Sequence, residues 1–218
     1  HTDTAFSMLQ KLDLTIEDYE CGVHAPSDKK TRYDLVLANK SISPLHNNCS
    51  GKHAGMLALA KKIGKEVKGY TKKDHPVQKI INDYICEISE SQDIQYEIDG
   101  CSAPNFRCSL RGLAFAMYSL TDMERLGKIR GNSVKAIMRG IQNFPLLVAG
   151  NGRACSELMM ATDSPLVVKT GAEGVFVAVL PEKQIGVALK VLDGSTRASE
   201  AAIALILVRL GMLNKDHP

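Results

Sequence analysis

The chain has 218 residues, of which 44% are hydrophobic and 23% are charged, and its formal net charge at pH 7 is +3. This length is enough to bury a sizeable core, and the composition is ordinary for a globular protein. The small charge, with no stripe of basic and aromatic residues, argues against nucleic-acid binding. Because no run of 18 apolar residues and no secretory signal occurs, we expect neither membrane insertion nor export.

The six cysteines are too sparse for a disulfide scaffold. They are Cys21, Cys49, Cys86, Cys101, Cys108 and Cys155. We therefore expect reduced thiols and a cytoplasmic protein. Both ends of the sequence read as cut from a longer chain, because it begins without methionine on a predicted helix.

The first elements in chain order are a helix over residues 2–12 and a short one that Thr15 opens. A polar connection follows, and within it Ser27–Lys30 has the Ser-x-x-Lys pattern of penicillin-recognising enzymes. That chemistry needs the serine at the start of a buried helix. We interpret this segment as a charged turn instead.

The stretch Pro44–His53 is the least generic part of the sequence, because mostly polar residues lead into an apolar helix that ends at Gly64. Cys49 and Lys52 are three residues apart, so they point the same way if both lie in the first turn. The helix N-terminus and the ammonium are expected to lower the pKa of the Cys49 thiol. The alternative is a packed cysteine beside a solvated lysine.

Three further polar groups, His46, Asn47 and His53, crowd the same loop, and small glycines there allow close approach of a ligand. These surroundings favour a site of attack on a carbonyl or of metal binding.

Past this stretch the elements alternate irregularly. A helix is predicted from Pro76 with a buried face made by Val77, Ile80, Ile81, Tyr84, Ile85 and Ile88. A strand over residues 94–98, helices over 109–120 and 132–143, a glycine-rich turn at 148–155, a hairpin of 175–180 with 185–192, and a helix over 198–210 complete the prediction. The fold class is therefore mixed α and β, without repeats.

Two more motifs indicate chemistry. Lys169-Thr170-Gly171 matches an element that penicillin-recognising hydrolases place on a strand beside the active site, and Glu173 follows in a tight, substrate-facing turn. If Cys101 meets Cys49 in space, the two thiolates and the amine of Lys52 would suffice for zinc. From the residues alone, two buried cysteines without metal are the favoured interpretation.

Several segments together resemble the asparaginase II family, the thermolabile asparaginases of Rhizobium type. They are Leu45–Met56, Asp74–Gln78, Asp99–Pro104, Val148–Gly150, Lys169–Val175 and Lys190–Gly194. The resemblance implies one catalytic region over residues 1–218, related in fold to serine β-lactamases and serine-dependent glutaminases, with an antiparallel sheet. It also implies hydrolysis of L-asparagine to aspartate and ammonia by a homodimer.

By the same resemblance, zinc is held by Cys49, Lys52 and Cys101, and Lys169 is the partner of a catalytic serine. Substrate-binding positions are expected at Asp99, His53, Cys155, Gly171 and Glu173. Lys52 is also expected to be catalytic. Family members carry the serines, in a Ser-x-x-Lys segment and a Ser-His-Ser-Gly-like motif, before the region where His1 falls, and they continue beyond Pro218.

Two alternatives to a zinc-assisted serine amidohydrolase are retained. One is a cysteine amidohydrolase in which Cys49 is the nucleophile. The other is a domain that binds zinc or a small molecule and has lost catalysis. The sequence does not predict a preference for asparagine over glutamine. The two differ by one methylene group, and the depth of the substrate pocket determines which of them fits.

Overall fold

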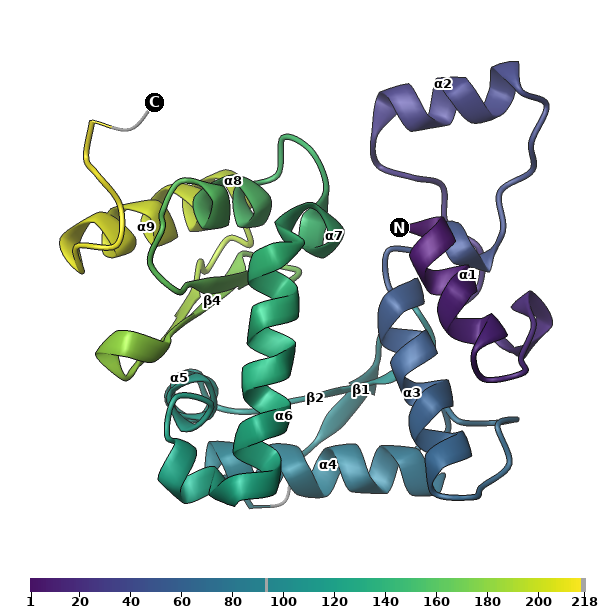
Figure 1. Ribbon diagram of the computed structural model, residues 1–218, viewed down its shortest axis with the longest axis horizontal. Helices are drawn as coiled ribbons and strands as arrows, with labels where there is room; N and C mark the ends of the chain where they lie inside the picture. Colours follow the sequence, from purple (N-terminus) through teal and green to yellow (C-terminus); the bar gives the residue numbers. More distant parts are fainter. Residues whose placement is uncertain (93, 217–218) are drawn as a thin grey trace. The chain divides into compact units, whose positions relative to one another are not determined.

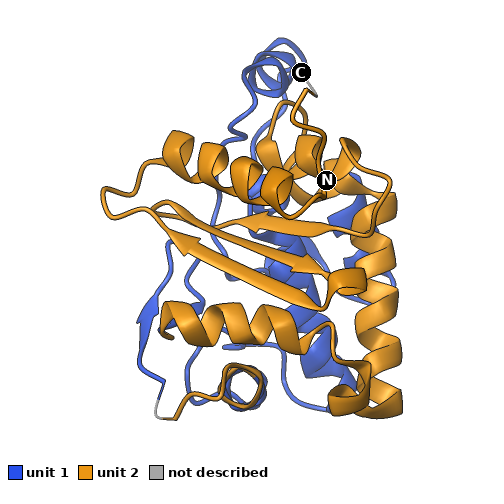
Figure 2. Ribbon diagram, turned by 90° about the vertical axis from the view of Figure 1, so that its left-hand side faces the viewer, with its two compact units in different colours: residues 1–84, 94–107 blue, residues 85–93, 108–218 orange. Residues whose placement is uncertain are grey.

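The computed structural model describes residues 1–92 and 94–216, which form two compact units (Figure 2). Unit 1 contains residues 1–84 and 94–107, and unit 2 contains residues 85–93 and 108–218. One catalytic region over residues 1–218 stays a prediction. The described residues combine helices with small antiparallel sheets, so the predicted mixed α and β class is confirmed.

Unit 1 is mainly helical (Figure 1). Its elements are α1 (Thr2–Gln10), the 3-10 turns Ile16–Asp18 and Pro44–His46, α2 (Lys29–Leu37), α3 (Ser50–Lys62), the first part of α4 (Pro76–Ser89), β1 (Tyr96–Ile98) and β2 (Pro104–Phe106). The core between α1 and α3 contains fully buried Leu9, Leu57 and Tyr70. The apolar spacing in α3 thus does pack, and Gly64 takes the left-handed backbone that ends the helix.

Helix α2 differs from the prediction, which made Ser27–Lys30 a charged turn and expected no helix after it. Asp28 caps the helix by accepting the backbone N–H of Thr31 at 2.7 Å. No residue of α2 is buried, and Figure 1 shows it at the end of an excursion away from α1 and α3. Because the helix buries no face, it has no apolar periodicity to reveal it.

Two further differences concern α4 and the strand after it. Ile80, expected on the buried face of α4, is exposed, whereas Val77 is fully buried. Strand β1 pairs antiparallel with β2, which lies in a segment expected to be a loop. Proline begins β2, and a strand of three residues is recognisable only through its partner.

Unit 2 is built on an antiparallel sheet with the strand order β3-β4-β5. Its elements are the end of α4, α5 (Leu110–Ser119), α6 (Met123–Asn143), α7 (Pro145–Ala149), α8 (Ala154–Met160), β3 (Val167–Thr170), β4 (Val175–Leu180), a 3-10 turn (Pro181–Lys183), β5 (Ile185–Lys190) and α9 (Thr196–Arg209). The predicted hairpin is confirmed as β4 and β5, whose register joins Val175 to Lys190.

Helix α5 covers one face of this sheet, and α8 and α9 cover the other (Figure 2). Gly186 permits the approach of α5, because a Cβ there would lie 2.1 Å from the backbone nitrogen of Tyr118. Helix α6 begins nine residues before the predicted Asn132, and Gly127 interrupts it with φ of 70°. That kink explains why its two parts do not share one apolar repeat.

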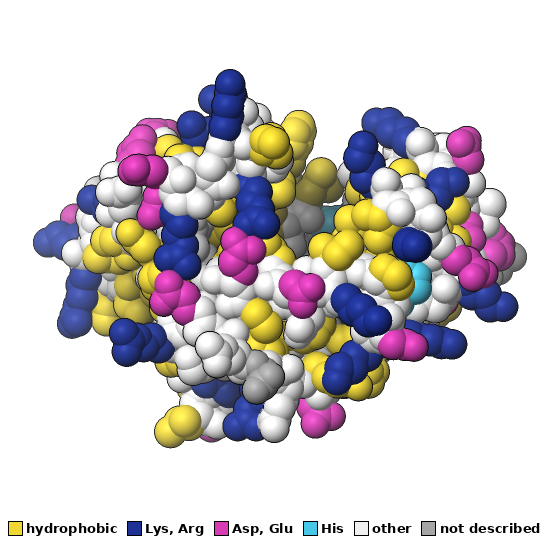
Figure 3. Space-filling view, turned by 90° about the horizontal axis from the view of Figure 1, so that it is seen from below, with side chains coloured by type: hydrophobic (Ala, Val, Ile, Leu, Met, Phe, Trp, Pro, Cys, Tyr) yellow, Lys and Arg dark blue, Asp and Glu magenta, His cyan; other side chains and the backbone are white. Residues whose placement is uncertain are grey.

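The surface carries mixed charges. Figure 3 shows lysine and arginine side chains interspersed with acidic ones on one face. That distribution agrees with the small net charge. Among the described helices, none is long and apolar enough to cross a membrane.

Candidate functional site

The junction between the 3-10 turn and α3 is fixed by Asn47. Its Nδ2 donates to the carbonyl of Cys21 at 2.8 Å, and its Oδ1 accepts the backbone N–H of Cys49 at 2.8 Å. Cys49 is the N-cap residue of α3, and its carbonyl accepts the N–H of His53 at 3.0 Å. The side chains of Cys49 and Lys52 therefore leave the first turn from a backbone that is anchored to the core.

The second segment of the site is the tight turn between β1 and β2. The N–H of Asp99 donates to the carbonyl of Ala103, and the N–H of Ser102 donates to the carbonyl of Asp99. Ser102 has φ of 69°, the left-handed backbone that lets this turn close. The turn carries Asp99 and Cys101 toward α3.

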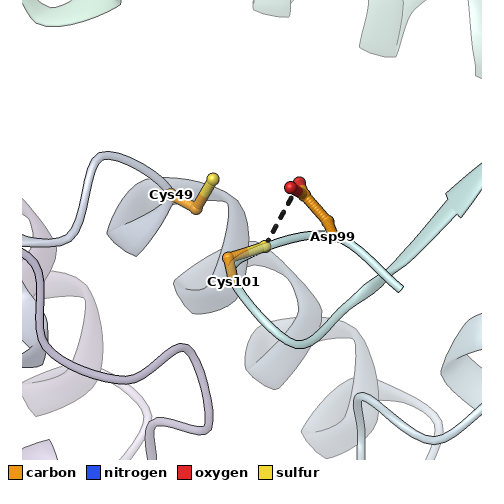
Figure 4. Close-up of side chains that lie close together, drawn as sticks. All are labelled: Cys49, Asp99 and Cys101. Atoms are coloured by element: carbon orange, nitrogen blue, oxygen red, sulfur yellow. Dashed lines mark hydrogen bonds between the residues drawn. The ribbon is translucent and has the colours of Figure 1, made fainter. Parts of the chain in front are cut away.

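These two segments meet in one cluster. The sulfurs of Cys49 and Cys101 and a carboxylate oxygen of Asp99 all lie within 4.8 Å of one another, and Figure 4 shows the three side chains converging. Lys52 Nζ lies 3.2 Å from Cys101 Sγ and 3.4 Å from Asp99 Oδ2. The thiol of Cys101 lies 3.5 Å from the same carboxylate oxygen. The meeting of Cys49, Lys52 and Cys101 in space is thus as expected.

The expected low pKa of the Cys49 thiol is wrong. Burial raises this pKa, and the neighbouring Cys101 and Asp99 also raise it, which outweighs the lowering by Lys52. Burial lowers the pKa of Lys52, but the hydrogen bond with Cys101 and the surrounding anionic groups raise it overall. Without metal, the lysine is therefore held as an ammonium among acidic groups.

Asp99 stays a carboxylate in this arrangement. Its burial raises the pKa, whereas the charge of Lys52 and the hydrogen bonds from Cys101 and Gly100 lower it by more. About two-fifths of the Asp99 side chain is exposed, and Lys52 is similarly accessible. The cluster is consequently reachable from solvent on one side and buried at Cys101 on the other.

The chemistry of the donors fits a thiophilic metal such as zinc. A pair of cysteine sulfurs binds zinc more strongly than it binds magnesium or calcium. The third ligand is either the amine of Lys52 or the carboxylate of Asp99. The amine binds metal only after losing its proton, which the raised pKa opposes. Asp99, expected only as a substrate-binding residue, is thus also a possible ligand, a role that the sequence did not suggest.

His53 has a different environment from the rest of the site. Its ring is fully buried, and its Nδ1 lies 2.6 Å from the hydroxyl of Tyr70. Burial, followed by the charge of Lys52, lowers its pKa to about 4, so the ring is neutral at pH 7. Direct contact of His53 with substrate stays a prediction, but the ring reaches no solvent in unit 1.

The other predicted residues lie in unit 2. Lys169 is exposed on β3, where its Nζ donates to the carbonyl of Thr170 at 2.5 Å. The N–H of Thr170 donates to the sulfur of Cys155 at 3.1 Å, so this buried side chain of α8 supports the end of β3. Gly171 and Glu173 are exposed in the turn between β3 and β4, and a tight turn was expected at these residues.

Tyr70 and Glu20 are neighbours of the site that the sequence reasoning missed. Both lie far from Cys49 and His53 in sequence, and Tyr70 is joined to His53 only through the fold. A buried tyrosine hydroxyl needs a polar partner, but the residue type alone does not reveal which one.

Comparison with known proteins shows the family of the chain. No curated protein matches the chain. The model of a protein family described as L-asparaginase II matches residues 1–218, the whole chain. The residues that gather at the first turn of α3 and at the turn after β1 lie within this match, and the chain belongs to the L-asparaginase II family, a family of amidohydrolases that act on asparagine.

Proposed function

We propose that this protein hydrolyses the side-chain amide of L-asparagine to aspartate and ammonia as a zinc-assisted enzyme of the serine type. The convergence of two thiols, an amine and a carboxylate at the start of α3 is the observation that carries the zinc assignment. Cys49, Lys52 and Cys101 would hold the ion. Bound there, zinc would act as a Lewis acid that polarises a carbonyl oxygen.

The residues of the chain have separate roles in this proposal. Asp99, kept anionic by Lys52, pairs with the ammonium group of the substrate. The exposed edge at Gly171 and Glu173 guides the substrate, and Cys155 supports that edge through Thr170.

The nucleophile is the serine that the resemblance assigns to the N-terminal segment of the family. Its hydroxyl loses a proton to the amine of Lys169 as its oxygen attacks the amide carbon. Ammonia leaves with that proton, and water then releases aspartate from the acyl-enzyme. We also propose a cytoplasmic homodimer.

The test combines metal analysis with ammonia release. We expect about one zinc per purified chain, and we expect Cys49→Ala to lose it. Cys86→Ala is the matched control, because Cys86 is another half-buried cysteine but lies in unit 2. Equal zinc content in both variants would contradict the metal site.

Ammonia release from L-asparagine, measured with protein that includes the serine segment of the family, decides the reaction. Release that follows the zinc content supports the proposal, whereas release from zinc-free protein contradicts the metal role. Two outcomes favour the alternatives. Calorimetric binding of asparagine without ammonia would indicate a binding domain, and loss of zinc-independent activity on alkylation of Cys49 would indicate a cysteine nucleophile. The raised pKa of Cys49 disfavours the latter.

A further inference from the structure

Tyr70 connects two parts of unit 1 through its hydroxyl. The residue is fully buried. Its oxygen accepts the backbone N–H of Glu20 at 3.0 Å and lies 2.6 Å from Nδ1 of His53. If the hydroxyl donates to Nδ1, the Tyr70 oxygen both accepts and donates, and the proton of the neutral His53 ring lies on Nε2. A single oxygen therefore joins the segment before the site to the first turn of α3.

The side chain of Glu20 fixes Tyr70 from the other direction. Its carboxylate accepts the N–H of Gly69 at 2.6 Å, and the N–H and hydroxyl of Thr71 at 3.3 and 2.7 Å. Gln78 Nε2 also donates to the carbonyl of Tyr70 at 2.8 Å. The Tyr70 hydroxyl is consequently held in place by contacts on both sides of the residue, so its position relative to Nδ1 of His53 is fixed.

His53 connects Tyr70 to the first turn of α3, which carries Lys52. It directly follows Lys52 on α3, and its ring packs edge-on against Tyr70 with the centroids 5.5 Å apart. The Nε2 of His53 is buried without a hydrogen-bond partner among the described residues. Because an unpartnered buried nitrogen is unfavourable, apolar packing alone does not account for a histidine here.

The geometry points to Tyr70 as a positioning residue for the cluster of Cys49, Lys52, Asp99 and Cys101. We propose that the contacts from Glu20 through Tyr70 to His53 set the rotation of the first turn of α3, and with it the direction in which Lys52 leaves the helix. This inference rests on the proposed function, because Lys52 is taken to hold zinc there. Tyr70 itself touches neither metal nor substrate in this role.

Tyr19 provides a matched control within the same core. It is also buried in the cluster around Leu9 and Leu57, but its hydroxyl has no hydrogen-bond partner among the described residues. Tyr70→Phe removes an oxygen that contacts both Glu20 and His53. Tyr19→Phe removes an oxygen that makes no hydrogen bond within the described part of the chain. Both variants keep the ring.

The experiment measures binding of Co²⁺ to the whole chain by its ligand-field absorption at a temperature where all variants are folded. We expect Tyr70→Phe to weaken Co²⁺ binding by about 10- to 100-fold and to alter the spectrum, as loss of a supporting hydrogen bond does at metal sites. Tyr19→Phe should leave both unchanged. Equal effects of the two variants, or none, would overturn the inference.

A second pair of variants covers the case in which Tyr70→Phe does not fold. His53→Asn keeps an acceptor near the place of Nδ1, whereas His53→Leu keeps the bulk without an acceptor. We expect Co²⁺ binding to survive in His53→Asn and to fall in His53→Leu. A global loss of packing would affect both alike, and equal behaviour would refute positioning by this hydrogen bond.

The two hypotheses fail in different ways. If the unaltered chain binds no Co²⁺ or Zn²⁺, the proposed metal site is wrong, and hydrogen exchange of the metal-free chain then decides the inference. Faster exchange confined to residues 50–56 in Tyr70→Phe, and not in Tyr19→Phe, would support positioning of α3. The same exchange in both variants would overturn it.

Discussion

Lys52 Nζ lies 3.2 Å from the sulfur of Cys101, on a turn 49 residues further along the chain. The ammonium is hydrogen-bonded to a thiol and to the carboxylate of Asp99 at the same time. In the metal-free chain Lys52 therefore compensates the acidic groups, and a metal ion would take over this role only by displacing its proton.

The third metal ligand can be identified with two substitutions. Arginine keeps its positive charge and offers no lone pair to a metal ion. We therefore expect Lys52→Arg to lower the affinity for zinc by a factor of about 10 or more, because one ligand is lost. Asp99→Asn should keep zinc while weakening asparagine binding. Elemental analysis and calorimetry measure the two effects, and the reverse pattern would make Asp99 the ligand.

Protonation of Glu20 in acid should lower the stability of the folded state. Burial raises the pKa of this carboxyl, but the hydrogen bonds from Thr71 and Gly69 lower it overall. A lowered folded-state pKa means that Glu20 stabilises the fold above its unfolded pKa of about 4.3, and that this contribution is lost as the pH falls through the folded pKa.

Urea unfolding of Glu20→Gln at several pH values tests this prediction. We expect the variant to be less stable than the unaltered chain by about 1 kcal/mol at pH 7, and the difference to shrink toward zero in acid. Glu182→Gln, at an exposed carboxyl of the turn between β4 and β5, is the control. A difference for Glu20→Gln that does not change with pH would contradict the assignment.

Gly186→Ala should strongly destabilise unit 2. Its Cβ would lie 2.1 Å from the nitrogen of Tyr118 and 2.4 Å from the carbonyl oxygen of Ala114, both backbone atoms of α5. We expect a loss of roughly 3 kcal/mol or more in the free energy of unfolding.

Gly140→Ala is the matched glycine substitution. It lies exposed in α6, and a Cβ there meets nothing within 4 Å. We expect it to be neutral or stabilising by up to about 1 kcal/mol, since alanine favours helix. If thermal or urea unfolding gave the two variants similar stabilities, the close packing of α5 on β5 would be wrong.

Cys155→Ala should loosen the end of β3. The variant leaves the N–H of Thr170 without the sulfur that accepts it at 3.1 Å. We expect a loss of about 1–3 kcal/mol and faster hydrogen exchange of the Thr170 amide. Cys155→Ser, which keeps an acceptor, should preserve most of the protection. Unchanged exchange in the alanine variant would show that this contact does not hold the strand.

The sequence predicted the elements whose residues repeat with a clear period. Helix α3 and the β4–β5 hairpin are examples, because each has an apolar face that packs within its own unit. Helix α2 escaped prediction although Asp28 is a good cap, since its side chains pack against nothing. Strand β2 escaped because only pairing with β1 makes its three residues a strand.

The site was predictable in part for the same reason. Cys49 and Lys52 share one helical turn, so their common direction follows from spacing, and the motif resemblance supplied Cys101. The pKa of Cys49 was not predictable, because it depends on how deeply the sulfur is buried and on the acidic neighbours that the turn after β1 brings. The hydrogen bond from Tyr70 to His53 likewise joins segments that only the tertiary fold brings together.

The division of unit 1 into two chain segments gives the metal site a further consequence. The chain leaves unit 1 after residue 84 and returns at residue 94, and Cys101 lies on the returning segment. An ion bound by Cys49 and Cys101 would act as a cross-link that closes a loop of roughly 50 residues. In the chain-entropy model such a link restricts the unfolded chain by about 4 kcal/mol. Removal of the ion by a chelator would therefore make the folded state of unit 1 less stable.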